Sequence, residues 1–352
     1  MSKNELTVSG TRLLLNSAES FHQGLSFFNA VYNPAFNRSA ETRDGWLARF
    51  RASGVNALRI WCQWDFEPPR SFVDTAPEHT MYTDAGESRE DSLRALAEIL
   101  EALDRRDMMA EVVLFSNEKQ PNLPVPAMEA ACRRMAEALA PHRHILLQIW
   151  NENSTEVRRC FEAVKSVDPD RIVTNSPGGA GVLADDEQNR MLDVLTPHTV
   201  RRRATEFWKE APRQIASLIE RYGKPVIDDE PARTGTVNYG GIPAGTESWQ
   251  HVEQIRAVRA AGGYHVYHHD MFQYPHGHPA IPPHGIPDPD FSPFHARVFA
   301  FLTEHRARPT DVRSPDPRTP HETRRIGGLR GTIRRISPDF DEPVADFDED
   351  SP

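Results

Sequence analysis

The chain of 352 residues is poor in cysteine. Its three cysteines, Cys62, Cys132 and Cys160, are too few and too scattered to form a disulfide framework. None belongs to a Cys-x-x-Cys pair or to a Cys/His pattern with the spacing of a structural zinc site. We therefore expect reduced, mostly buried thiols, and the sequence gives no reason to expect a resident metal or another cofactor.

Long apolar runs are also absent. Nowhere do about 18 consecutive apolar residues occur, the length that predicts a membrane-spanning helix. The first ten residues, MSKNELTVSG, contain no apolar core of a signal peptide after Lys3. On the sequence as given we expect a cytoplasmic protein without membrane association; only a start codon placed too far downstream would hide a secretion signal.

Positive charge is scarce, since the formal net charge is −10. Nucleic-acid binders need a basic face for phosphate contacts, so a nucleic-acid partner is not expected. The acidity suits a neutral or cationic small molecule or a sugar. With 38% apolar residues a sizeable core is possible, and the length accommodates one α/β barrel with additions. The oligomeric state stays open.

What the chain does contain is a regular alternation of short apolar runs with longer amphipathic segments. Residues 55–61 (VNALRIW) are typical of a strand, and in residues 91–107 leucines recur at helical spacing. Eight such pairs of strand and helix predict a closed (β/α)8 barrel rather than an open doubly wound sheet. The eight expected strands are residues 24–30, 55–61, 109–115, 145–150, 171–176, 192–198, 224–229 and 264–269.

The sequence outside this alternation predicts two further segments. Residues 1–20 are expected to hold an N-terminal β-hairpin that turns at Ser9-Gly10, and residues 21–309 to form the barrel. Residues 310–352 are rich in proline and charge, basic first and acidic last, which predicts a mostly disordered tail.

Polar side chains end two of the expected strands. In barrels the active site lies at the C-terminal ends of the strands, and here strand four ends in Asn151-Glu152 and strand seven in Asp228-Asp229-Glu230. Alternation along strand four places Leu146, Gln148, Trp150 and Glu152 on one face. Along strand seven it places Val226, Asp228 and Glu230 together. Both glutamates are therefore predicted to point inward at the same rim.

Two carboxylates that face each other across a barrel mouth can perform glycoside hydrolysis. One is protonated to assist the leaving oxygen, and the other is ionised to attack or to activate water. Arg59, expected inward on strand two, would keep the nucleophilic carboxylate ionised. Trp61 and Trp64 follow it and could stack on a sugar ring or serve only in packing.

Three motifs carry a family resemblance. GVNALRIW, LLQIWNEN and KPVIDDEP resemble the strand-two, strand-four and strand-seven signatures of the clan of retaining (β/α)8 glycoside hydrolases that includes cellulases and mannanases, and the chain looks like a family 5-type member. The opening FHQGLSFFNAVYNPAFN is similar to the first strand and loop of cellulase-like members. The resemblance spans roughly residues 5–306.

This resemblance implies roles for individual residues. It makes Glu152 the general acid/base, and Glu230, five residues after Pro225, the nucleophile. Asn151 would hydrogen-bond the sugar 2-hydroxyl, Arg59 would support Glu230, and His198 looks like the strand-six histidine. The implied activity is retaining hydrolysis of a β-linked oligo- or polysaccharide.

Two departures from the family pattern concern substrate and activity. Val200 stands where members often have an aromatic hydroxyl, and strand eight lacks the tryptophan that often forms a sugar platform. Tyr264, Tyr267 and Phe272 are the candidate replacements for that platform. These departures favour a second hypothesis, a catalytically silent barrel that binds carbohydrate.

Further alternatives stay open at the level of sequence. Glu152 could cap the helix that is expected near Thr155, Glu230 could form a structural ion pair, and Asp228 or Asp229 could be the working carboxylate. Arg59 could be an ordinary ion-pair partner. A third functional hypothesis is a metal-dependent hydrolase that uses a run of imidazoles and one carboxylate at strand eight. That run consists of His265, His268, His269, Asp270, His276, His278 and His284.

Overall fold

The computed structural model describes residues 2–63, 80–116, 122–178, 185–201, 206–231, 246–268 and 285–306. All of them belong to one compact unit, Met1–Arg308. The expected tail at 310–352, the candidate residues Trp64 and Phe272, and the histidines from His269 to His284 lie outside the described residues.

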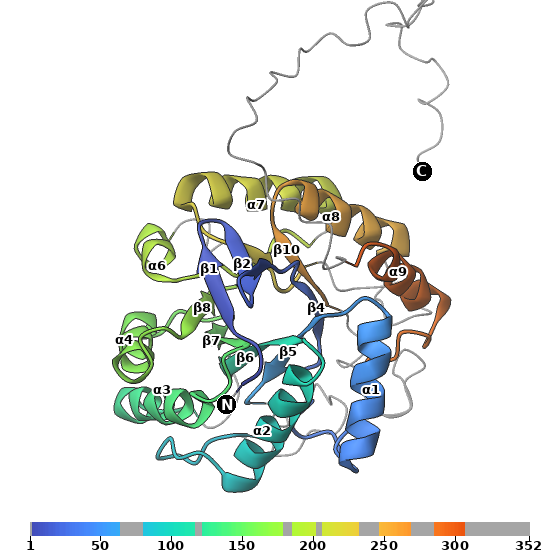
Figure 1. Cartoon of the computed structure of the whole chain (residues 1–352). Coiled ribbons are helices and arrows are strands. Elements are labelled where there is room, and N and C mark those ends of the chain that lie inside the picture. Colours follow the sequence, from blue (N-terminus) through green and yellow to red (C-terminus); the bar gives the residue numbers. More distant parts are fainter. Residues whose placement is uncertain are drawn as a thin grey trace, which may run out of the picture. The chain divides into compact units, whose positions relative to one another are not determined.

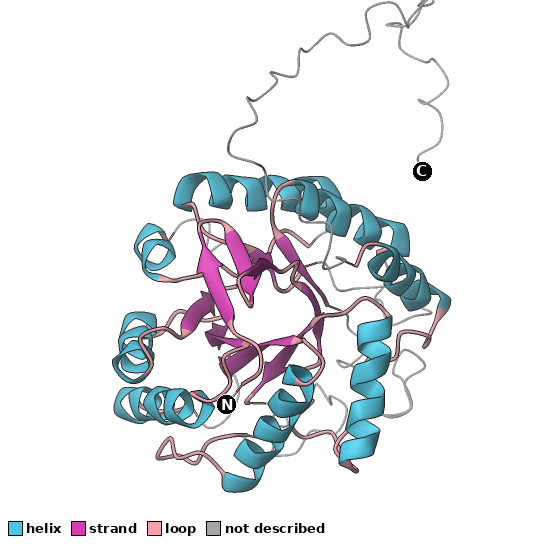
Figure 2. Ribbon diagram, in the orientation of Figure 1, coloured by secondary structure: helices cyan, strands magenta, loops and turns pink. Residues whose placement is uncertain are grey.

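The described unit is built around a curled parallel sheet (Figure 2). Its strands are almost entirely buried, which explains why they appear in the sequence as continuous apolar runs rather than as alternating patterns. The strand order is β8-β7-β6-β5-β4-β10-β9, so consecutive strands are neighbours and β10 returns beside β4. The strands are β4 (Gln23–Ser26), β5 (Ala57–Trp61), β6 (Met109–Ser116), β7 (Ile145–Asn151), β8 (Ile172–Ser176), β9 (Ile227–Asp228) and β10 (Tyr264–Tyr267).

The strand expected at residues 192–198 is reduced to an isolated parallel bridge between Leu195 and Val226. On the other side the N–H of Asp193 donates to Val173 at 3.0 Å, so the segment lies between β8 and β9. The ladder is short because the Asp193 side chain, not a backbone carbonyl, accepts the Val173 N–H, and because Pro197 has no N–H to donate. With this segment in the sixth position, the arrangement is consistent with a (β/α)8 barrel.

Helices follow the strands and surround the sheet (Figure 1). Their apolar faces and the outward side chains of the strands form the main core. In the described parts of the chain, no helix is long and apolar enough to cross a bilayer. The helices are α1 (Ala40–Ala52), α2 (Glu90–Asp104), α3 (Val125–Leu139), α4 (Val157–Val167), α6 (Asp186–Met191), α7 (Phe207–Tyr222), α8 (Ser248–Ala260) and α9 (Pro293–Glu304).

The predicted N-terminal hairpin is confirmed. Strands β1 (Leu6–Ser9) and β2 (Arg12–Leu15) pair antiparallel around Ser9-Gly10, and the two-residue strand β3 (Ala18–Glu19) pairs with β2. Figure 1 shows β1 and β2 lying across the centre of the helical ring. A second, smaller core joins the hairpin to the first residues of the barrel strands, and its members include Leu6, Leu13, Leu146, Ile227 and Tyr264. The hairpin thus covers the N-terminal end of the barrel and leaves the C-terminal end for a site.

Helix α9 packs closely against the turn that follows α1, at Gly54. Gly54, with φ of +88°, ends the turn after α1, and a Cβ there would overlap the carbonyl of Leu302 near the end of α9. Gly223, after α7, also has a positive φ of +63°, but a Cβ there would meet nothing within 4 Å. A comparison of the two glycines therefore distinguishes the cost of the backbone conformation, which both share, from the cost of the close contact, which only Gly54 has.

We predict that Gly54→Ala destabilises the protein far more than Gly223→Ala. The left-handed backbone costs an alanine about 1–2 kcal/mol at either site. The clash adds about 1–3 kcal/mol at Gly54 only. Urea unfolding of both variants measures the difference in the free energy of unfolding. Equal losses would show that α9 does not press on this turn.

Candidate active site

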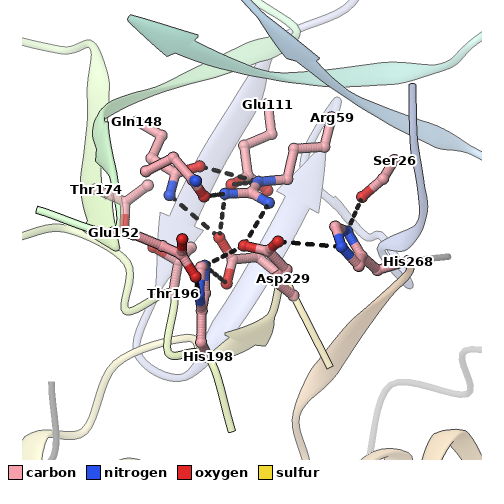
Figure 3. Close-up of polar contacts among 12 residues, drawn as sticks. Ser26, Arg59, Glu111, Gln148, Glu152, Thr174, Thr196, His198, Asp229 and His268 are labelled. Atoms are coloured by element: carbon pink, nitrogen blue, oxygen red, sulfur yellow. Dashed lines mark hydrogen bonds and ion pairs between the residues drawn. The ribbon is translucent and has the colours of Figure 1, made fainter. Parts of the chain in front are cut away.

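Arg59 lies at the centre of the polar cluster at the C-terminal end of the sheet (Figure 3). Its side chain is fully buried and points inward from β5. Nε donates to Glu111 at 3.2 Å and to Gln148 at 3.0 Å, and Nη2 donates to Asn151 at 2.7 Å. Nη2 is also 3.0 Å from Asp229 Oδ2, and Nη1 is 3.6 Å from Glu230 Oε2. One buried cation therefore joins β5, β6, β7 and the segment after β9.

The expected alternation along β7 is wrong at its end. The pairing of β7 with β8 shifts register between Gln148 and Asn151, and Glu152 has a left-handed backbone with φ of +60°. As a result the consecutive residues Asn151 and Glu152 both reach the polar cluster, which regular alternation forbids. Non-glycine residues in this conformation are uncommon and cluster at functional sites.

The expected alternation after β9 is wrong as well. Asp228 is predicted to share the inward face with Glu230, but its oxygens accept from Thr199 Oγ1 at 2.8 Å and from Gln254 of α8 at 3.0 Å. It therefore points outward, away from Arg59. Because β9 ends at Asp228, both Asp229 and Glu230 can reach the interior.

His198 stands between the two predicted catalytic glutamates. Its Nδ1 is 3.1 Å from Glu152 Oε1, and its Nε2 is 2.8 Å from Glu230 Oε2. One carboxylate oxygen of each glutamate and one His198 nitrogen lie within 4.8 Å of one another. Glu152, Glu230, Asn151, Arg59 and His198 are thus brought to one place.

From the sequence, His268 is named only within the histidine run of the metal hypothesis, and Arg201 is not singled out. His268, directly after β10, has Nε2 3.0 Å from Glu230 Oε1, while its Nδ1 is 2.9 Å from Ser26 Oγ. The signal is present in the sequence, since Val266 faces the barrel interior and a residue two positions on shares that face. Arg201 contacts both glutamates, at 3.4 Å from Glu152 and 3.5 Å from Glu230, and no pattern in the sequence marks it.

The surroundings set the charge of the carboxyl groups. Burial alone would raise the pKa of Glu230, but its interactions with His198, His268 and the Arg201 guanidinium outweigh this effect and hold the pKa well below 4.5. The hydrogen bond with His198 lowers the pKa of Glu152, against burial and the charge of Glu230. Burial raises the pKa of Asp229 far above its usual range, although Arg59 opposes this effect.

The two tyrosines predicted as a sugar platform do not face the site. Tyr264 begins β10 at the opposite end of the barrel, where its hydroxyl accepts the Leu13 N–H at 2.8 Å. Tyr267 points outward to α9, with its hydroxyl 2.9 Å from His295 Nδ1. Trp61 does lie at the site, but it is buried with its ring 4.2 Å from the Arg59 guanidinium carbon. Both tyrosines are therefore corrected: neither side chain faces the cluster.

One alternative for a site residue loses its support. Helix α4 begins at Val157 with Glu156 as its N-cap, and the Asn153 side chain accepts the N–H groups of Ser154 and Thr155, so Glu152 does not cap the helix. Most residues of the strand-eight metal hypothesis, from His269 to His284, lie outside the described residues, so that hypothesis is not tested. Among the described residues, the group that could hold a metal ion is Glu152, His198 and Glu230. The guanidinium of Arg201 beside this group opposes a bound cation.

No protein-family model matches the sequence, and a comparison with curated proteins finds no match. Solved structures do match the fold. A glycoside hydrolase family 5 protein from Bacteroides vulgatus has 16% identity and a TM-score of 0.57, with 76% of this chain and 62% of that chain covered. A family 5 mannosidase from Rhizomucor miehei has 12% identity, a TM-score of 0.56, and 85% and 99% coverage.

A β-1,4-D-mannanase from Cryptopygus antarcticus is similar at 12% identity and a TM-score of 0.57, with 86% and 94% covered. The chain spans 57% to 66% of the length of three matched glycoside hydrolases, one of which is the Bacteroides vulgatus family 5 protein above. The expected likeness to family 5 and related glycoside hydrolases is confirmed, and at these identities it is a likeness of fold.

Asp228 generates a prediction about pH and stability. Burial raises its pKa from 3.8 to about 7 in the folded protein. The folded state therefore holds a proton that the unfolded state has lost, so stability falls as pH rises between these values and stays lower above about 7. Asp228→Asn removes this loss, since Asn can still accept from Thr199 and the Gln254 amide can turn to accept from it.

We expect Asp228→Asn to melt at a higher temperature than the unmodified protein at pH 8 and at nearly the same temperature at pH 4. Melting curves across this pH range test it, with Asp290→Asn as the control because that carboxylate is exposed. If the melting temperatures of Asp228→Asn and the unmodified protein change with pH in the same way, the raised pKa assigned to Asp228 is wrong.

Proposed function

We propose that this protein is a retaining glycoside hydrolase that cleaves a β-linked oligo- or polysaccharide with Glu152 and Glu230. The observation that carries the proposal is the approach of the two carboxylates, with one oxygen of each within 4.8 Å of the other. Retaining glycosidases hold their carboxyl groups about 5–5.5 Å apart, and inverting ones about 6.5–9.5 Å. The fold likeness to family 5 hydrolases supports the same chemistry.

Exposure and charge assign the two roles. Glu230 is almost completely buried, and its contacts with arginine and histidine side chains lower its pKa, which favours the ionised form that a nucleophile needs. The Glu152 side chain is 41% exposed and can reach a leaving group that extends toward solvent. Asp228 points away from the site. Burial raises the pKa of Asp229, and its Oδ2 is held by Arg59, so neither aspartate is suited to attack.

The proposed reaction is a double displacement. A carboxylate oxygen of Glu230 attacks the anomeric carbon while Glu152 gives its proton to the departing glycosidic oxygen. Water then attacks the anomeric carbon of the glycosyl ester, and Glu152, now a carboxylate, takes a proton from that water. The bond to Glu230 breaks, which releases the sugar and leaves Glu230 as a carboxylate again. In the first step Glu230 loses its negative charge while Glu152 gains one, and the second step reverses this exchange.

Asn151 is suited to bind the reacting sugar. Its Oδ1 is held by Arg59, which fixes the orientation of the amide. The amide Nδ2 hydrogen-bonds to none of the described residues and can donate to a hydroxyl of the sugar. Such a bond to the 2-hydroxyl strengthens in the transition state.

One observation favours the silent carbohydrate-binding barrel instead. The Arg201 guanidinium contacts both Glu152 and Glu230, where the glycosidic bond would have to lie. If that contact persists in the presence of a sugar, the barrel binds without cleaving. Turnover and covalent trapping decide between the two functions.

We predict that Glu152→Gln and Glu230→Gln each lower kcat by about three orders of magnitude or more, with little loss of stability, because each removes one half of the displacement. Activity on a panel of aryl β-glycosides measures the effect. Glu156→Gln is the matched control, since Glu156 follows the same strand but pairs with Arg159 outside the cluster. Unchanged turnover in either catalytic variant would refute its role.

Incubation with 2-deoxy-2-fluoro β-glycosides identifies the nucleophile directly. The expected result is a sugar adduct on Glu230, seen by peptide mass spectrometry and absent from Glu230→Gln. An adduct on Asp229, or no adduct from any sugar that the enzyme turns over, would show that the roles are assigned wrongly.

The lowered pKa of Glu152 predicts different pH dependences for the free enzyme and the complex. In the free enzyme Glu152 loses its proton below pH 4.5, so kcat/KM falls as pH rises through this acid range. A bound sugar excludes water from Glu152 and thereby raises its pKa. The alkaline limb of kcat should therefore lie at higher pH than that of kcat/KM, and coincident limbs in the two profiles would contradict the assignment.

A further inference from the structure

Within the described parts of the chain, Arg201 pairs through its guanidinium with no carboxylate outside the proposed catalytic pair. It follows the sixth-position segment three residues after His198, and its side chain is 24% exposed. Its Nη2 lies 3.4 Å from Glu152 Oε1 and 3.5 Å from Glu230 Oε2, and it also contacts His198 Nδ1. Among the described residues, its ionic partners are thus the two proposed catalytic carboxylates themselves.

This position conflicts with turnover unless Arg201 moves. The anomeric carbon and the glycosidic oxygen must lie between Glu152 and Glu230 for the proposed reaction, and the guanidinium contacts both groups. A sugar that enters therefore separates Arg201 from its carboxylates. The attack turns Glu230 into an ester and Glu152 into a carboxylate, so the total charge of the pair does not change. The separated guanidinium of Arg201, however, no longer contacts either carboxylate, and it needs another anionic partner.

We propose that the substrate supplies the missing anion: the site takes β-glycosides whose sugar carries a carboxylate, and Arg201 binds that carboxylate once it leaves Glu152 and Glu230. This inference rests on the proposed function and adds the class of substrate. A guanidinium pairs with a carboxylate through two parallel hydrogen bonds, which gives both charge balance and orientation. The exposed part of Arg201 makes it reachable from solvent.

The charge of the whole chain does not oppose this assignment at contact distance. The net charge of −10 disfavours the distant approach of an anion, but salt screens such forces beyond about 10 Å. At the site itself, Arg59, Arg201, His198 and His268 lie around the nucleophile. Local recognition therefore decides between an acidic and a neutral sugar.

Matched pairs of sugars that differ only in the carboxylate test the proposal. Binding of glucuronate and glucose, galacturonate and galactose, and mannuronate and mannose to the full chain is measured by isothermal titration calorimetry. We expect at least one acidic sugar to bind about tenfold or more tightly than its neutral partner. Arg201→Gln should abolish this preference, and Arg201→Lys should keep part of it.

Arg213→Gln is the control, because Arg213 is a solvent-exposed arginine on α7 that pairs with Glu210. It should leave the preference unchanged. Equal binding within every pair, tighter binding of the neutral sugars, no binding of any acidic sugar, or a preference that survives in Arg201→Gln would each overturn the proposal. If Arg201→Gln does not fold, the comparison of matched sugars on the unmodified chain still decides it.

The two proposals fail in different ways. Turnover of neutral aryl glycosides with an adduct on Glu230, but without preference for acidic sugars, would overturn the assignment of Arg201 and leave the hydrolase intact. An Arg201-dependent preference for an acidic sugar without any turnover or adduct would retain the assignment of Arg201 and replace the hydrolase by a binding barrel.

Discussion

The buried guanidinium of Arg59 is the interaction on which the rest of the site depends. A buried cation is tolerated only where carboxylates and hydrogen-bond acceptors compensate its desolvation, and Arg59 obtains them from Glu111, Gln148, Asn151 and Asp229. Because these partners come from β6, β7 and the segment after β9, satisfying one side chain fixes the relative positions of several strand ends. The orientation of Glu230 follows from that arrangement, since it lies at the edge of the same network.

Much of the fold could be predicted because parallel strands and amphipathic helices leave strong periodic signals. Seven of the eight expected strands appear, and the exception, residues 192–198, has a physical reason in Pro197 and the Asp193 side chain. The motifs and their spacing also predict a shared site for Glu152, Glu230, Arg59, Asn151 and His198, and these five side chains do lie together. Periodicity fails where a bulge or a strand end interrupts it, as at Asn151 and Asp228.

The aromatic predictions fail for a different reason. Tyr264 and Tyr267 are predicted from residue type alone, without the register of β10, and register decides which end and which face a side chain occupies. His268 is hard to recognise as a partner of Glu230 because it stands within a histidine-rich run that suggests metal binding. Arg201 lies after the sixth position, where sequence gives no periodic signal, so its contact with both carboxylates requires three-dimensional information.

The left-handed backbone at Glu152 carries an evolutionary consequence. Glycine or asparagine would adopt this conformation at lower cost, so replacing Glu152 by either would relax the backbone and at the same time remove the carboxylate that the proposed chemistry needs. In a copy of this gene freed from selection for chemistry, position 152 should be among the first to drift, before the apolar strands around it. The residue at this position would therefore report whether a descendant barrel still works as an enzyme, independently of how well its fold is preserved.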